Sequence, residues 1–249
     1  MAIVLLTALG VGVSTAIGAI IGFVFKKITH RFADIVLAFA AGVMLSAAVL
    51  GLIIPSVEYG GDYGVLVTVF GIFVGALCLG VLDKILPHEH IMLDNKEVIE
   101  HSKLTKVMLF VGAIAMHNLP EGIAAGVGFG VGDTAQALII AGGIALQNIP
   151  EGMVIIGPML LAGIKPKKTL AIAPLTGLVE VVGTLLGYFA ISVAEAVLPF
   201  ILAFAGGTML YVISHEMIPE THAHGEQKGA TYALILGFCL MLVTDVLLG

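Results

Sequence analysis

Long apolar stretches recur along the whole sequence, and they constrain the fold more than any other feature. The chain is 59% hydrophobic and only 11% charged, whereas soluble domains carry about 25% charged residues. A stretch of about 20 apolar residues is long enough to cross a bilayer as a helix, and the strict alternation of barrel strands is missing. We therefore predict an all-α polytopic membrane protein. Its single domain, residues 1–249, would have eight transmembrane helices, at about 3–25, 35–56, 65–86, 106–128, 135–161, 169–193, 198–218 and 230–248, with a histidine-containing loop at 87–104.

The positive charges predict the orientation of these helices. All 11 Lys and Arg residues lie in or beside every second connection between the predicted helices, namely Lys26, Lys27, Arg31, Lys84, Lys96, Lys103, Lys106, Lys165, Lys167, Lys168 and Lys228. Connections rich in Lys and Arg stay in the cytoplasm. We expect a multi-pass protein of the cell membrane with both termini on the outer side. The net charge of −6 gives no sign of nucleic-acid binding.

Two near-copies of one polar motif interrupt the apolar stretches. They are His117–Gly122, which reads H-N-L-P-E-G, and Gln147–Gly152, which reads Q-N-I-P-E-G. Each motif begins about half-way along its helix, which at about 1.5 Å per residue is near the middle of a hydrocarbon core of about 30 Å. The first residue and the glutamate are four apart and share a helix face, and each proline frees a carbonyl one turn earlier. The spacing predicts one polar pocket at the middle of the membrane.

The residue types in this pocket favour a metal ion. Imidazole and carboxylate ligands suit Zn²⁺ and other divalent first-row metals. A buried glutamate costs a few kcal/mol in the membrane interior, and a dication would neutralise two of them. The alternative is a pair of structural proline kinks whose polar residues are satisfied by neighbouring helices.

The paired motifs, on the fourth and fifth of eight predicted helices, resemble those of the ZIP family of zinc and iron transporters, in particular its ZupT/GufA-like prokaryotic branch. The resemblance extends over essentially the whole chain. It implies a homodimer that imports divalent cations through a binuclear site between the two motif helices. It also implies a 3+2+3 arrangement with an inverted repeat, and alternating access by movement of the metal-bearing helices.

The resemblance assigns roles to individual residues. One metal would be bound by His117, Glu121, Gln147 and Glu151, and a second by Asn118, Asn148, Glu151 and Glu180, with Glu121 and Glu151 as candidate bridges. Asn148 departs from relatives that carry Asp at this position, which weakens the second metal position. Met44 is either a thioether ligand or a packing residue. Glu58 and Asp245 match acidic entrance residues, although both are also ordinary polar helix ends, and His215 and Glu216 match exit-side ligands.

The remaining histidines and acidic residues indicate the direction of transport. Asp62 and Glu195 are expected outside with the entrance residues, where acidic groups would gather dications. Histidines gather on the predicted inner side, where they either hand off or sense metal or are simply solvated: His88, His90, His101, His222 and His224. This asymmetry predicts import. The zinc-protease pattern H-E-x-x-H fails at His215 because Pro219 occupies its last position.

The sequence therefore favours a carrier for Zn²⁺, with Fe²⁺, Mn²⁺, Co²⁺ and Cd²⁺ as further candidate cargoes. Its partners would be divalent metal ions and lipid, with no catalytic cofactor. A metal-selective channel is the first alternative. An intramembrane metalloenzyme is the second, but the sequence has no further nucleophile constellation, so we expect a protein that is not an enzyme.

Overall fold

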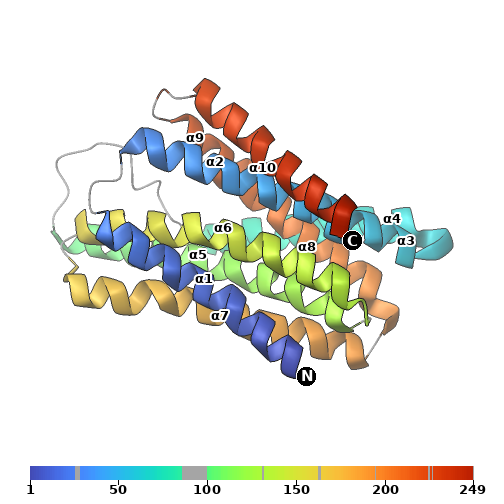
Figure 1. Cartoon of the computed structure of the whole chain (residues 1–249). Coiled ribbons are helices and arrows are strands. Elements are labelled where there is room, and N and C mark those ends of the chain that lie inside the picture. The colour runs from blue at the N-terminus through green and yellow to red at the C-terminus, as the bar shows by residue number, and fades with distance from the viewer. Residues whose placement is uncertain are drawn as a thin grey trace.

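The computed structural model of the chain describes residues 1–25, 29–85, 100–130, 132–161, 164–193, 195–223, 225 and 227–248 (Figure 1). Within these ranges all regular structure is helical. The elements are α1 (Ala2–Val24), α2 (His30–Ser46), the π-helix η1 (Ala47–Ile53), α3 (Ile54–Tyr59), the 3₁₀-helix η2 (Gly61–Tyr63), α4 (Gly64–Ile85), α5 (Glu100–Gly130), α6 (Thr134–Leu161), α7 (Pro166–Val193), the 3₁₀-helix η3 (Glu195–Val197), α8 (Leu198–Val212), the π-helix η4 (Ile213–Met217), α9 (Ile218–His222) and α10 (Gln227–Leu248).

Several helices extend further than predicted. The segment expected at 35–56 is helical from His30 to Tyr59, and α5 begins at Glu100 instead of residue 106. Residues 100–104 of the predicted loop 87–104 are therefore helical, and the rest of that loop lies outside the described residues. Hydropathy detects only the part of a helix in the apolar core of the membrane, whereas a polar first turn can still be helical. Thr29, for example, caps α2 by accepting a hydrogen bond from the Phe32 backbone N–H at 3.3 Å.

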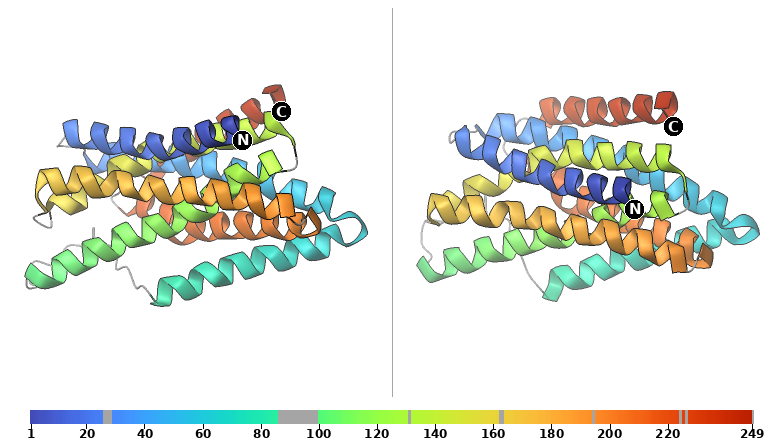
Figure 2. Two further views of the ribbon diagram at one scale, coloured as in Figure 1. Left: turned by 90° about the horizontal axis from the view of Figure 1, so that it is seen from below. Right: turned by 60° about the horizontal axis from the view of Figure 1, so that its bottom comes forward.

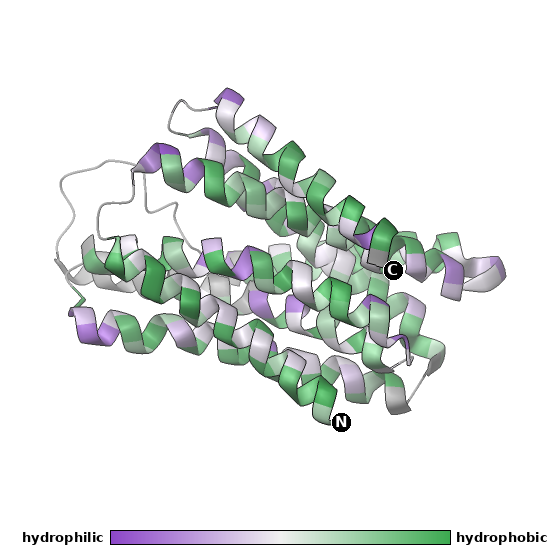
Figure 3. Cartoon of the chain, viewed as in Figure 1, coloured by the Kyte–Doolittle hydropathy of each residue, from purple (hydrophilic) through white to green (hydrophobic). Residues whose placement is uncertain are grey.

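Seven helical stretches among the described residues are long and apolar enough to cross a membrane. They are Ala2–Val24, His30–Tyr59, Gly61–Leu82, Thr134–Gly157, Pro166–Ile191, Leu198–His222 and Gln227–Leu247. The 31-residue α5 is not among them, and its membrane crossing stays a prediction. Figure 3 shows hydrophilic residues at the helix ends and also in the middle of the bundle. The chain is an integral membrane protein with polar groups at its centre.

The helices form a four-helix core, and two further helix pairs, which contact each other through η1, α3 and α8, pack against it. Helix α1 packs on α6 and α7, and α5 packs on α7 and α6. The flanking pairs are α2 with α10 and α4 with α8; α2 contacts the core through α6, and α8 contacts it through α5. Both termini lie toward the same end of the bundle in the views of Figures 1 and 2.

Glycines make the close contacts within the core, and they do so reciprocally. A Cβ on Gly12 of α1 would lie 2.5 Å from the Gly177 carbonyl oxygen of α7, and a Cβ on Gly177 would lie 2.3 Å from the Gly12 oxygen. Small residues at such positions let helix backbones approach closely in membranes. The same spacing continues in both helices, with the α1 glycines facing α6 and the α7 glycines facing α5: Gly18 and Gly22, and Gly183 and Gly187. Helix α1 is therefore placed against α6 much as α7 is placed against α5.

Two π-helical turns, which the sequence analysis did not predict, precede prolines. The π-helix η1 is followed by Pro55 near the start of α3, and η4 is followed by Pro219 near the start of α9. Proline lacks an N–H and clashes with the carbonyl one turn earlier, so a widened turn before it relieves the conflict. Such π-turns occur often at functional sites, and η4 contains the predicted exit residues His215 and Glu216.

Candidate metal site

The two motifs lie within the core helices, the first in α5 and the second in α6. The glycine that ends each motif brings a third and a fourth helix to the site. A Cβ on Gly122 would lie 2.3 Å from the Glu180 carbonyl oxygen of α7, and a Cβ on Gly152 would lie 2.2 Å from the Thr15 carbonyl oxygen of α1. Both prolines are accommodated within continuous helix. Glu180 and Thr15 thereby stand at the level of the motifs.

Most of the predicted ligands are buried. Asn118, Asn148 and Glu180 are 0% exposed. Glu121 and Gln147 are also buried, and Glu151 is half-buried. No Lys or Arg side chain is buried among the described residues, so nothing there offers the carboxylates a buried cation. The His117 backbone lies in α5, and its side chain lies outside the described residues.

Two neighbouring amides of α6 each donate to a carboxylate of a different helix. Gln147 hydrogen-bonds to Glu121 of α5. Asn148 Nδ2 donates to Glu180 Oε2 at 2.7 Å and to the Val11 carbonyl at 3.3 Å. Thr15 Oγ1 donates to Glu180 Oε1 at 3.2 Å. The hydrogen bonds bring α1, α5, α6 and α7 together at one polar centre.

Several buried polar atoms of this centre have no hydrogen-bond partner: Asn118 Nδ2 and Oδ1, Glu121 Oε2, Gln147 Oε1 and Asn148 Oδ1. Leaving a buried donor or acceptor unsatisfied costs about 1–3 kcal/mol, and each such group in a native structure calls for an explanation. Four of the five atoms are carboxylate or amide oxygens, which bind dications. No three described His, Cys, Asp or Glu side chains come together as a metal cluster, so a metal site here would need ligands beyond these, such as amide oxygens.

Met44 belongs to the apolar core. It is 1% exposed and lies in a buried cluster with Ala48, Leu52 and Ile144. The packing role is therefore shown, and a role as thioether ligand stays a prediction.

The residues predicted on the exit side have different surroundings. His215 is exposed and stacks on Tyr211, with ring centroids 5.0 Å apart and planes 11° apart. Glu216 is half-buried. His222 is held locally, since its Nδ1 lies 2.8 Å from the Ile218 carbonyl oxygen and its Nε2 lies 3.4 Å from Thr231 Oγ1. His88, His90, His224 and the side chain of His101 lie outside the described residues.

The predicted entrance residues are also partly accessible. Glu58 is exposed, and Asp245 of α10 is half-buried and accepts a hydrogen bond from Gln136 Nε2 of α6 at 3.0 Å. Asp62 is exposed, and the Glu195 side chain lies outside the described residues.

Thr15 is the site residue that the sequence analysis missed. A threonine in an apolar helix carries no signal by itself. The repeated glycine spacing was the available signal, because Thr15 follows Gly12 by three residues as Glu180 follows Gly177.

Membrane-length helices around a buried cluster of carboxylates and amides define a polytopic membrane protein with a polar centre. The family model described as ZIP Zinc transporter matches residues 87–245. The chain is 38% identical to Zinc transporter GufA of Myxococcus xanthus, over 98% of each chain. It is 36% identical to Zinc transporter ZIPB of Bordetella bronchiseptica, over 95% of this chain and 78% of that protein. It is 34% identical to Zinc transporter ZupT of Chlorobaculum parvum, over 95% and 94%.

The chain belongs to the ZIP zinc transporter family. The resemblance named from the two motifs is thereby confirmed. The family and these relatives are transporters, not enzymes, so the intramembrane metalloenzyme is set aside.

Proposed function

We propose that this protein imports Zn²⁺ into the cytoplasm through a site between α5 and α6 at the middle of the membrane. The unpartnered buried oxygens of Glu121, Gln147 and Asn148 carry the proposal, because they gather at the two motifs without a buried Lys or Arg among the described residues. Family membership supports zinc as cargo. Carboxylate and amide oxygens also admit Fe²⁺, Mn²⁺ and Co²⁺, and the imidazole also suits Cd²⁺.

One dication would be bound by His117, Glu121, Gln147 and Glu151. The i, i+4 spacing places each pair on one face of its helix. Gln147 donates to Glu121 through its amide nitrogen, which leaves its Oε1 and the Glu121 Oε2 as acceptors for a cation. The resemblance implies a second position, with Asn118, Asn148, Glu151 and Glu180 as ligands.

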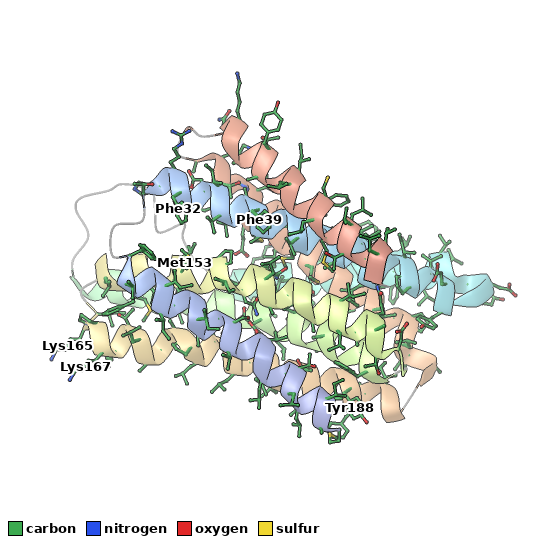
Figure 4. The ribbon with its side chains drawn as sticks, viewed as in Figure 1. Phe32, Phe39, Met153, Lys165, Lys167 and Tyr188 are labelled. Atoms are coloured by element: carbon green, nitrogen blue, oxygen red, sulfur yellow. The ribbon has the colours of Figure 1, made fainter. Side chains whose placement is uncertain are left out.

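The position of the positive charges supports release toward the end of the bundle where Lys165 and Lys167 lie (Figure 4). Buried apolar residues of α6 lie on both sides of its motif, Ile140 and Ile144 before it and Ile155 and Ile156 after it, so burial along α6 does not favour either direction. The exit candidate His215 of η4 is exposed. By the positive-inside rule the end with the lysines is cytoplasmic. His215 and Glu216 would receive the ion there, and Glu58 and Asp245 would gather it outside.

Alternating access is the proposed mechanism, in a homodimer of chains with eight transmembrane helices and both termini outside. The reciprocal glycine contacts of α1 and α7 support a 3+2+3 inverted repeat, the architecture of many carriers with a midplane site. In such carriers one group of helices moves against the other. A channel is the alternative, and it would give flux that does not saturate.

Uptake into proteoliposomes that contain a divalent-metal indicator tests the function. We expect saturable Zn²⁺ entry that His117→Ala and Glu151→Ala each reduce at least about a hundredfold, since each removes a ligand of the transported ion. His30→Ala, an exposed histidine at the start of α2, is the matched control and keeps wild-type flux. Folded protein without metal flux would overturn the proposal, and non-saturating flux would favour the channel.

A further inference from the structure

Glu180 and Thr15 occupy corresponding positions in α7 and α1, two helices that have the same glycine spacing and that each approach one motif helix. Gly12 and Gly177 touch each other's backbone, and three residues later α1 has Thr15 where α7 has Glu180. The two side chains meet at 3.2 Å. The polar centre thus has one carboxylate and one hydroxyl where a symmetric site would have two equal groups.

Both carboxylate oxygens of Glu180 already have a neutral donor. Oε1 accepts from the Thr15 hydroxyl, and Oε2 accepts from the Asn148 amide at 2.7 Å. Glu121 differs, because its Oε2 has no partner. Hydrogen bonds to an ionised carboxylate are roughly twice as strong as neutral ones. A cation at Glu180 would have to share each carboxylate oxygen with a donor that already stabilises it, whereas Glu121 Oε2 has no such donor.

Position 148 determines whether a second carboxylate faces Glu180. Asn148 is fully buried and offers Glu180 a neutral donor. An aspartate at this position would remove that donor and place a second carboxylate beside Glu180, and a buried pair of carboxylates is expensive in the membrane interior without a cation.

We propose that Asn148 and Thr15 hold Glu180 as a structural hydrogen-bond acceptor, so that the transport site takes one dication at a time. Asn148 is in this sense a specificity-determining residue, because its amide nitrogen stabilises the Glu180 carboxylate in the place of a second cation. The proposal rests on the proposed transport site between α5 and α6.

The test is the number of Zn²⁺ ions bound per chain, measured by equilibrium dialysis and elemental analysis of purified protein in nanodiscs. All variants carry His215→Ala and Glu216→Gln, so that the exit-side candidates do not contribute. We expect Glu180→Gln to leave the count unchanged and Asn148→Asp to raise it by one. Asn148→Asp combined with Glu180→Gln should return to the starting count, because the added ion needs both carboxylates.

Two results would overturn the proposal: loss of one Zn²⁺ in Glu180→Gln alone, or no additional Zn²⁺ in Asn148→Asp. Thr15→Val and Thr15→Ser are a second pair of variants if Glu180→Gln does not fold. Both should keep the wild-type count of Zn²⁺. Loss of an ion in Thr15→Val but not in Thr15→Ser would also contradict the proposal. His117→Ala separates this proposal from the proposed function. If His117→Ala keeps the full count, the proposed transport site is wrong. If His117→Ala loses one ion, the proposed transport site holds, and the counts of the Glu180 and Asn148 variants then decide the single-ion proposal.

Discussion

At the residue scale, the glycine that follows each glutamate determines the shape of the site. Gly122 and Gly152 let the α7 and α1 backbones approach the motif helices so closely that a Cβ would lie 2.3 Å and 2.2 Å from a carbonyl oxygen. A methyl group cannot occupy that space unless the helices separate. The motif glycines thereby place Glu180 and Thr15 at the site.

Gly152→Ala should impair both stability and transport. Forcing a methyl group into a packed interface costs about 1–3 kcal/mol, and the separation of α6 from α1 would also move Asn148 away from its acceptor on Val11. Thermal unfolding in detergent and Zn²⁺ uptake measure the two effects.

Gly157→Ala is the matched control on the same helix, since Gly157 is exposed and a Cβ there meets nothing within 4 Å. It should be neutral or slightly stabilising, because alanine favours a helix over glycine by about 1 kcal/mol. Equal effects of the two substitutions would show that the close approach at Gly152 does not matter.

At the element scale, the two π-helical turns accommodate prolines without ending their helices. Helix α2 continues through η1 into α3, and α8 continues through η4 into α9. A π-turn amounts to an extra residue in an α-helix, so its removal leaves the flanking turns in phase.

Deletion of Leu50 in η1 should therefore be tolerated better than deletion of Phe73 in α4. The first can close the π-turn into an α-turn. The second rotates the rest of α4 by about 100° and carries Gly75 away from α8, where a Cβ on it would lie 2.2 Å from the Phe204 carbonyl oxygen. The yield of monodisperse protein and its melting temperature compare them. Equal loss of folded protein in both deletions would contradict this account of η1.

At the scale of the whole molecule, orientation decides what the site can do. Both termini lie toward the same end of the bundle (Figure 1), which agrees with the predicted eight crossings. The opposite end carries Lys165 and Lys167 (Figure 4). The proposed direction of transport depends on that end facing the cytoplasm.

Cysteine labelling in intact cells checks the orientation. After Cys78→Ala and Cys239→Ala remove the native thiols, a membrane-impermeant maleimide should label Asp62→Cys directly and Lys167→Cys only after permeabilisation. Both positions are exposed, so each serves as the other's control for reactivity. The reverse pattern would invert the topology and with it the entrance and exit assignments.

The sequence determined the class of fold and predicted the position of the proposed site. Long apolar stretches leave a chain in a membrane few options besides helices, and the Lys and Arg residues lie at or near the ends of the predicted helices, so composition and the length of the apolar stretches were sufficient. The motifs were recognisable because His117, Glu121, Gln147 and Glu151 have no place in an apolar helix unless they bind something polar. Helix ends were predicted less well, since a polar turn beyond the membrane leaves no hydropathy signal.

Only the tertiary structure decided how the site is completed. The approach of α1 and α7 at the motif glycines depends on contacts between residues far apart in sequence, and it gives Thr15 a role that its own segment does not indicate. The same contacts give both oxygens of Glu180 a donor, whereas Glu121 retains one free oxygen. A hydrogen bond has direction and length, and these are fixed only when the helices are packed. The carboxylates are identified by the sequence, and the packing determines which of their oxygens have a hydrogen-bond donor and which have none.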